Sequence, residues 1–197
     1  MIKPFDFYFD FGSPYTFLAH KEIRKIENEN SIKINYMPIL LGGLLKYTGI
    51  KTNADIPTKA KYMIKDCKLW AEKKKIKFKF NDFFPIITLK LMRCVLVAEK
   101  KKFAQIFIDR IFDTIWKDGL NLNDETVLKK ILKTLDINPD IFLTEAEEVG
   151  TKNKLIEKTE EAFQKGIFGS PSFIINNKIF WGQDRLEFVL NESKKQN

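Results

Sequence analysis

Aromatic and polar residues alternate at the start of the chain. Every second residue from 5 to 11 is a phenylalanine, a pattern that predicts a strand with one face in a core. Gly12 predicts a turn. Ser13 stands where a helix N-cap belongs, and Pro14 stands at the first helical position, which tolerates its missing N–H. Apolar residues continue at helical spacing to residue 26, so a strand, a tight turn and a helix are expected.

Three further patterns follow before residue 76. Residues 31–36 alternate again and predict a second strand that Pro38 ends, which gives a βαβ opening. Residues 40–49 form a looser apolar segment that leads out of the sheet. Residues 57–75 carry an apolar stripe at helical spacing and predict a helix.

Only helical patterns occur between Pro85 and Gly166. The expected helices span residues 89–101, 103–116, 124–135, 139–148 and 152–165. Asn123 or Asp124 is expected to cap one of them, and Asn138 another. The block is too long for a simple crossover between two strands. It is therefore expected to form a helical lobe inserted into an α/β unit.

The strand pattern returns near the C-terminus. Residues 172–175 and 178–181 predict two strands, and two asparagines between them predict the turn of a hairpin. A last helix is expected from Asp184 to about Glu192, with Asp184 and Glu187 as a capping-box-like pair.

The expected element order is βαβ, a block of helices, and then ββα. This is the order of a thioredoxin-like fold, an α/β fold, with a large all-helical insertion. We expect residues 1–40 and 166–197 to form the thioredoxin-like domain. Residues 41–165 are expected to form the inserted helical domain.

Composition and charge narrow the class of protein. Hydrophobic residues make up 44% of the 197 residues, and 18 residues are phenylalanine, enough for a sizeable core. The net charge of +8 comes from lysines spread along the chain, so no nucleic acid partner is expected. There is no signal-peptide pattern and no uncharged apolar stretch of about 20 residues. We therefore expect a soluble, cytoplasmic protein without a membrane partner.

Cysteine and histidine are scarce. Cys67 and Cys94 lie far apart, each inside a helical pattern, which indicates buried thiols in a reducing compartment. His20 is the single histidine and is expected on the flank of the first helix, at the surface. No metal site is expected.

The start of the first helix is the first candidate for chemistry. Backbone N–H groups and the helix dipole favour an anion there, and a thiolate is such an anion. Thioredoxin-fold proteins carry Cys-x-x-Cys at this corner, but residues 13–16 are Ser-Pro-Tyr-Thr. A sulfur would have to come from outside, held by a hydrogen bond from Ser13. The alternative is that Ser13 is only a helix cap.

Two more places could complete such a site. Ser170 and Pro171 precede the third strand, where thioredoxin-like proteins place a cis-proline and where a free backbone edge can pair with an extended peptide; Pro171 could equally be a plain strand-start residue. The helix start at Asp184 could bind an α-amino acid end, or it could be a capping box and nothing more. Together the three places would hold a thiolate, a peptide backbone and an amino acid end, which are the parts of glutathione.

Three stretches carry a family resemblance. They are Phe-Asp-Phe-Gly-Ser-Pro-Tyr at residues 9–15, Pro-Thr-Lys-Ala-Lys-Tyr-Met-Ile-Lys-Asp at 57–66, and Gly-Ile-Phe-Gly-Ser-Pro-Ser-Phe at 166–173 followed by Phe-Trp-Gly-Gln-Asp-Arg-Leu at 180–186. They resemble 2-hydroxychromene-2-carboxylate isomerases and, more distantly, kappa-class glutathione transferases. The resemblance runs nearly from end to end.

The resemblance implies a thioredoxin-fold homodimer that uses glutathione. Ser13 matches the serine that hydrogen-bonds the glutathione sulfur, and Tyr15 belongs to the same motif. The other implied glutathione contacts are Ser170 and Pro171 at the cysteinyl unit and Gln183, Asp184 and Arg185 at the γ-glutamyl end. Lys46, Lys51 and Asn53 match the region that borders the substrate and the glycine carboxylate. Relatives commonly have Asn where this chain has Ile50, and Asn53 is a candidate replacement.

Three functions are compatible with these residues. The first is a glutathione-dependent isomerase that converts 2-hydroxychromene-2-carboxylate to trans-o-hydroxybenzylidenepyruvate, or acts on a related small aromatic substrate of aromatic degradation. In it Ser13 stabilises the glutathione thiolate, and Lys46 or Lys51 binds the substrate carboxylate. The alternative is a kappa-class-like transferase that conjugates glutathione to an electrophile. The third is a non-catalytic thioredoxin-fold module, which would not bind glutathione.

Overall fold

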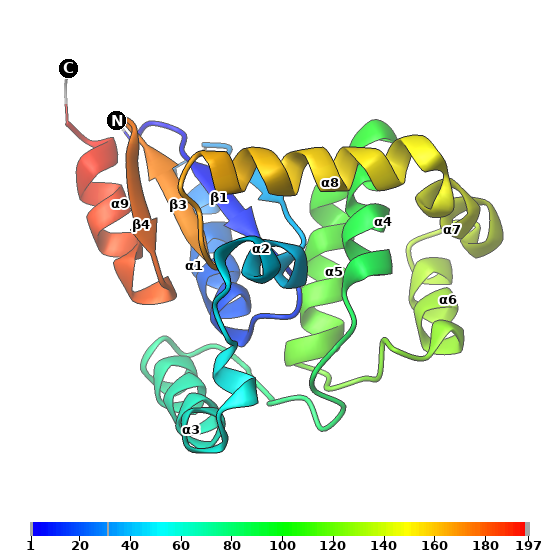
Figure 1. The fold of residues 1–197 in the computed structure, drawn as a ribbon, viewed down its shortest axis with the longest axis horizontal. Helices are drawn as coiled ribbons and strands as arrows, with labels where there is room; N and C mark the ends of the chain where they lie inside the picture. The colour runs from blue at the N-terminus through cyan, green and yellow to red at the C-terminus, as the bar shows by residue number, and fades with distance from the viewer. Residues whose placement is uncertain (1, 31, 196–197) are drawn as a thin grey trace.

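The computed structural model describes residues 2–30 and 32–195 and contains a four-stranded mixed sheet (Figure 1). The strands are β1 (Asp6–Phe9), β2 (Asn35–Pro38), β3 (Ser172–Ile175) and β4 (Lys178–Trp181). Their order is β2-β1-β3-β4; β1 and β2 are parallel, and the other neighbours are antiparallel. The predicted order of elements, βαβ, helices and then ββα, is confirmed.

The bounds of β3 and β4 are those predicted from the sequence pattern. Strand β1 is shorter than the alternating stretch 5–11, because only residues 6–9 pair in the sheet, and β2 is displaced. The predicted second strand began at residue 31, which lies outside the described residues, and was expected to end before Pro38. The strand instead runs from residue 35 through Pro38, which pairs with Phe9. Proline is tolerated because β2 is an edge strand, where one side of the backbone has no ladder partner.

Helices cover both faces of the sheet. Helix α1 (Pro14–Asn30) packs against the face formed by Phe7 and Phe9, both fully buried. The opposite face, which carries Tyr8, is covered by α2 (Leu41–Thr48) and α8 (Val149–Gln164) (Figure 1). Residues 40–49 were expected to form a looser segment, so α2 is a correction. Leucines three and four residues apart give this segment an apolar helical face that buries Leu44.

The helical block forms a lobe on one side of the sheet (Figure 1). Its helices are α4 (Leu89–Lys100), α5 (Ala104–Trp116), α6 (Glu125–Lys133), α7 (Pro139–Glu147) and α8. Asp124 caps α6 by accepting from the Thr126 amide, and Asn138 caps α7. Helix α8 begins three residues earlier than the predicted residue 152. Helix α3 (Pro57–Lys73) stands apart from this lobe, next to α1.

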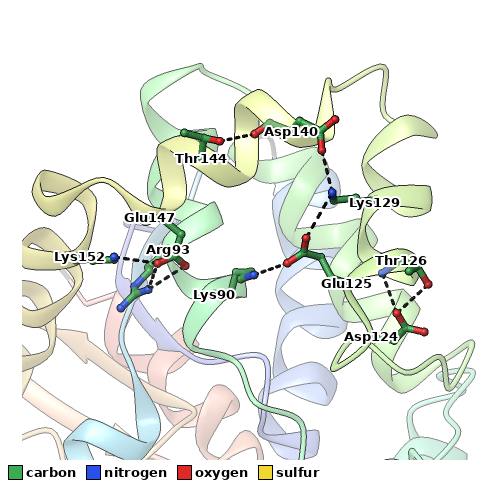
Figure 2. A network of polar contacts seen from close by, with 10 residues as sticks. All are labelled: Lys90, Arg93, Asp124, Glu125, Thr126, Lys129, Asp140, Thr144, Glu147 and Lys152. Carbon is green, nitrogen blue, oxygen red and sulfur yellow. Dashed lines mark hydrogen bonds and ion pairs between the residues drawn. The ribbon is translucent and has the colours of Figure 1, made fainter.

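Ion pairs connect the helices of the lobe (Figure 2). The pairs between helices are Lys90–Glu125, Lys129–Asp140, Arg93–Glu147 and Lys152–Glu147. Exposed pairs of this kind contribute about 0–1 kcal/mol each. Burial of apolar side chains between α4, α5 and α7 is therefore the larger source of the lobe's stability.

The last helix starts differently from the prediction. A short 3-10 helix, η2 (Gln183–Arg185), precedes α9 (Leu186–Ser193). Neither N-cap residue makes a side-chain capping bond, so Asp184 and Glu187 do not form the expected capping box. The carboxylate of Asp184 therefore remains on the surface, where it pairs with Arg185 at 3.2 Å.

His20 is fully buried, so the predicted surface position is wrong. Its Nδ1 shares a hydrogen bond of 2.9 Å with the Tyr36 hydroxyl, and its Nε2 lies 2.9 Å from Asp109 Oδ1. The ring stacks on Phe112, 4.7 Å between centroids. Burial lowers the pKa of His20, although Asp109 acts in the opposite direction.

None of the helices within residues 2–30 and 32–195 has the length and apolar character of a membrane span.

Candidate functional site

Ser13 joins two of the three predicted parts of the site. Its Oγ accepts a hydrogen bond from the Thr16 amide at 3.2 Å, which caps α1. The same hydroxyl donates to the main-chain oxygen of Ser170 at 3.0 Å. A residue 157 positions away is thus brought against the start of the first helix. Ser13 is a helix cap, and it also faces the loop that precedes β3.

The Ser170–Pro171 peptide bond is cis, as expected for a thioredoxin-like fold. The Ser170 hydroxyl lies 2.9 Å from the Thr16 hydroxyl, which fastens this loop to α1 a second time. The Gly182 amide donates to the main-chain oxygen of Pro171 at 3.0 Å. The cis peptide therefore lies between the start of α1 and the residues that lead into η2.

Gln183 carries a polar atom without a partner. The residue is only 3% exposed, and its Oε1 finds no hydrogen-bond partner within residues 2–30 and 32–195. A buried acceptor without a donor costs about 1–3 kcal/mol. The element η2 packs against α1, and Gly182, the residue before Gln183, bonds to Pro171, so this acceptor lies in the third predicted part of the site.

A family model described as the DSBA-like thioredoxin domain matches residues 5–194. The chain belongs to this family. The match covers nearly the whole chain and agrees with the mixed sheet, the helical insertion and the cis-proline. The predicted thioredoxin-like fold is confirmed.

The curated relatives agree with the resemblance carried by the three motifs. A 2-hydroxychromene-2-carboxylate isomerase of Sphingobium xenophagum is 27% identical over 191 residues, 96% of this chain and 97% of the relative. A protein of that name from Pseudomonas putida is 25% identical, covering 95% of this chain and 92% of its own. The human glutathione S-transferase kappa 1 is 23% identical, and the match covers 93% of this chain and 88% of the human protein.

Solved structures support the fold. A structure of 2-hydroxychromene-2-carboxylate isomerase superposes with a TM-score of 0.87 at 23% identity, over 95% of this chain and 92% of that one. A probable DsbA oxidoreductase from Streptomyces coelicolor superposes with a TM-score of 0.72 at 12% identity, over 98% of this chain and 92% of that one.

The two cysteines of this DSBA-like chain are not placed for thiol chemistry. Cys67 and Cys94 are both fully buried, and burial raises the pKa of each thiol to about 12. Both remain protonated near neutral pH and are poor nucleophiles. Any thiolate at the Ser13 corner must therefore come from a ligand. The described residues contain no cluster of His, Cys, Asp or Glu that could hold a metal ion.

Asp10 organises this corner and was missed from the sequence. It is fully buried; its Oδ1 accepts from the Gly12 amide at 2.8 Å, and its Oδ2 accepts from the Leu41 amide at 2.7 Å. One carboxylate thus fixes the turn before Ser13 and the start of α2. Burial raises the pKa of Asp10, while these amides act against that shift. Its position in an alternating strand pattern gave no signal of this role.

The other predicted contacts make no hydrogen bond to Ser13 or Ser170 among the described residues. The Tyr15 hydroxyl donates to Asp66 Oδ2 on α3 at 2.9 Å. Lys46, Lys51 and Asn53 are exposed on α2 and on the segment that follows it. No hydrogen bond or ion pair between described residues connects these three side chains to Ser13. Ile50 is 47% exposed.

Proposed function

We propose that this chain is a glutathione-dependent isomerase that converts 2-hydroxychromene-2-carboxylate to trans-o-hydroxybenzylidenepyruvate, or acts on a related substrate of aromatic degradation. The contact between the Ser13 hydroxyl and Ser170 carries the proposal, because it brings the Ser13 corner, where the sulfur of a ligand would bind, together with the cis-proline loop. The names of the relatives with 25–27% identity support the isomerase class.

The polar groups of the corner suit glutathione. Ser13 can turn its hydroxyl hydrogen from the Ser170 oxygen to a sulfur, and that oxygen is then free to accept an amide N–H from the ligand. Gln183 Oε1 and the exposed Asp184 carboxylate can accept from an ammonium group. Arg185, which pairs with Asp184, can bind the adjacent carboxylate.

The protein's contribution is electrostatic. Bound glutathione would supply a thiolate that adds reversibly to the substrate and is returned unchanged. Ser13 and the N-terminus of α1 stabilise negative charge on the sulfur, which lowers the pKa of the thiol. We assign substrate and glycine carboxylate binding to Lys46, Lys51 and Asn53, and we assign Tyr15 a role in glutathione binding through its hydrogen bond to Asp66. We further propose a cytoplasmic homodimer, which sedimentation of the purified protein can test.

A kappa-class-like transferase is the second candidate, favoured by relatives named glutathione S-transferase kappa 1 at 22–23% identity. The two activities differ in what happens to glutathione. An isomerase returns it, whereas a transferase consumes one molecule for each product formed.

Calorimetric titration with reduced glutathione is the first test, followed by the isomerase assay with and without glutathione. We expect saturable binding, glutathione-dependent conversion and complete recovery of the thiol. Loss of thiol with formation of a conjugate would replace the isomerase with the transferase. Absence of binding at millimolar glutathione would contradict both enzymes and leave a binding module.

A further inference from the structure

Helix α3 is attached to the rest of the molecule mainly through α1. Its apolar side buries Met63, Cys67 and Ala71 in the main core. The connections on either side, residues 49–56 and 74–88, contain little regular structure in the described chain, apart from the 3-10 helix η1 (Asn53–Asp55). The position of α3 therefore depends on the contacts that it makes with α1.

One side-chain hydrogen bond fixes α3 beside the candidate site. The Tyr15 hydroxyl donates to Asp66 Oδ2 at 2.9 Å, across 51 positions of sequence. Burial raises the pKa of Tyr15, and the neighbouring Cys67 and Asp66 raise it further, so the hydroxyl remains a donor. Hydrogen bonds to a charged acceptor are stronger than neutral ones. Tyr15 lies two residues after Ser13, so the bond connects α3 directly to the Ser13 corner.

Helix α3 in turn positions η1. Only Ile56 separates the two elements in the chain, and their residues are in contact. Reciprocal hydrogen bonds form a capping box at the start of η1: the Thr52 amide donates to Asp55 Oδ2 at 2.9 Å, and the Asp55 amide donates to Thr52 Oγ1 at 3.2 Å. Lys51 and Asn53 flank Thr52, so their position relative to Ser13 is set through α3.

We propose that Asp66 is a positioning residue of the candidate site. Through Tyr15 it holds α3, and with it the segment from Lys51 to Asn53, at a fixed place relative to Ser13, and so sets the affinity for the anionic end of the thiol ligand. The identity of that ligand, glutathione, rests on the proposed function. Tyr15 ends the first family motif, and Asp66 ends the second. The hydrogen bond between them explains why both motifs include these residues.

The test compares variants that break the bond with one that keeps it. Tyr15→Phe and Asp66→Ala should each weaken glutathione binding about tenfold, as expected for loss of a hydrogen bond to a charged group. The double variant should bind no more weakly than either single variant, because both remove the same bond. Asp66→Asn keeps an acceptor oxygen for the Tyr15 hydroxyl, so its affinity for glutathione should be within about threefold of that of the wild type.

Turnover separates positioning from a catalytic role. At saturating glutathione, turnover and the pKa of the bound thiol should stay within about twofold of wild type in Asp66→Ala, because Ser13 is untouched. Tyr62→Phe and Glu72→Gln, on the exposed side of α3, are the matched controls and should bind as wild type does. Equal affinity in Tyr15→Phe, or an equally weak Asp66→Asn, would overturn the proposal.

Amide hydrogen exchange without ligand tests the positioning independently of glutathione. We expect faster exchange at Thr52 and Asp55 in Tyr15→Phe and Asp66→Ala, with no change in the α6 amides. A wild-type protein that fails to bind glutathione would contradict the proposed function and the affinity effect. Unchanged exchange at Thr52 and Asp55 would overturn the positioning itself.

Discussion

Ser13 shows how a helix cap can also serve a site. Its oxygen accepts from the Thr16 amide while its hydrogen points to Ser170. The acceptor role stabilises α1, and the donor role is exchangeable, since a hydroxyl hydrogen rotates freely. Capping and binding of a sulfur are therefore compatible functions of one side chain.

Ser13→Ala should lower turnover by about 10- to 1000-fold, because one hydrogen bond to a reacting anion is lost. It should also destabilise the protein by about 1 kcal/mol through loss of the cap. Kinetics at saturating glutathione and urea unfolding measure the two effects. Asp124→Ala, which removes the cap of α6, should lose similar stability and no activity. Unchanged turnover in Ser13→Ala would rule out its role in catalysis.

Gln183 should show a conflict between stability and binding. Gln183→Leu removes the buried Oε1 that lacks a partner, so the ligand-free protein should gain up to about 1 kcal/mol. Glutathione should bind at least about tenfold more weakly, because its amino end loses an acceptor. Thermal unfolding and calorimetry measure the pair of effects. Unchanged binding would show that this acceptor does not face the ligand.

His20 should make stability depend on pH. Its pKa is lowered in the folded protein from an ordinary value of 6.5, so the unfolded state binds a proton first as the pH falls. Folding stability is then complete above about pH 6.5 and decreases by up to about 1.4 kcal/mol per pH unit below it, down to the folded pKa. Urea unfolding at several pH values measures this slope, and His20→Gln should abolish that part of it. Because the chain has one histidine, NMR titration of its ring gives the folded pKa directly; a value above 6.5 would contradict the prediction.

At the scale of elements, local signals and long-range contacts were predictable to different degrees. The N-cap at Ser13 and the hairpin of β3 and β4 follow from neighbouring residues, and both were predicted at the observed positions. Burial of His20 and the bond between Tyr15 and Asp66 depend on helices that are distant in sequence. No periodicity encodes such contacts. The start of α1, the cis-proline loop and the residues before η2 were expected to lie together because the fold, once inferred, brings them together. That they bind glutathione stays a prediction.

The hairpin turn gives a prediction at this scale. Asn176 and Asn177 adopt φ of 49° and 59°, the left-handed values of a type I′ turn. Asn177→Val should destabilise the protein by about 1–2 kcal/mol, because a β-branched residue disfavours this region. Asn177→Gly should be tolerated. The difference between the two melting temperatures is the measurement, and equal values would contradict the left-handed turn.

At the scale of the whole molecule, one core joins the sheet to the helical lobe. Phe112 on α5 packs against Phe9 at 6.0 Å and Phe11 at 4.8 Å between ring centroids. The Trp116 indole N–H donates to the main-chain oxygen of Phe11 at 2.7 Å. The division into residues 1–40 with 166–197 and an inserted 41–165 stays a prediction. The buried contacts across that boundary indicate that the two parts stabilise each other.

The shared core predicts that sheet and lobe unfold together. Phe112→Ala should cost about 3–5 kcal/mol, because a fully buried ring is removed. If the two parts form one cooperative unit, native-state hydrogen exchange should then accelerate by the same factor for amides of β3 and of α5. Ile141→Ala, at a site 58% exposed on α7, should change neither. Acceleration confined to α4–α8 would instead show that the inserted helices open independently. In that case α5 could separate from the strand that leads to Ser13, and variants in the lobe would change activity without unfolding the sheet.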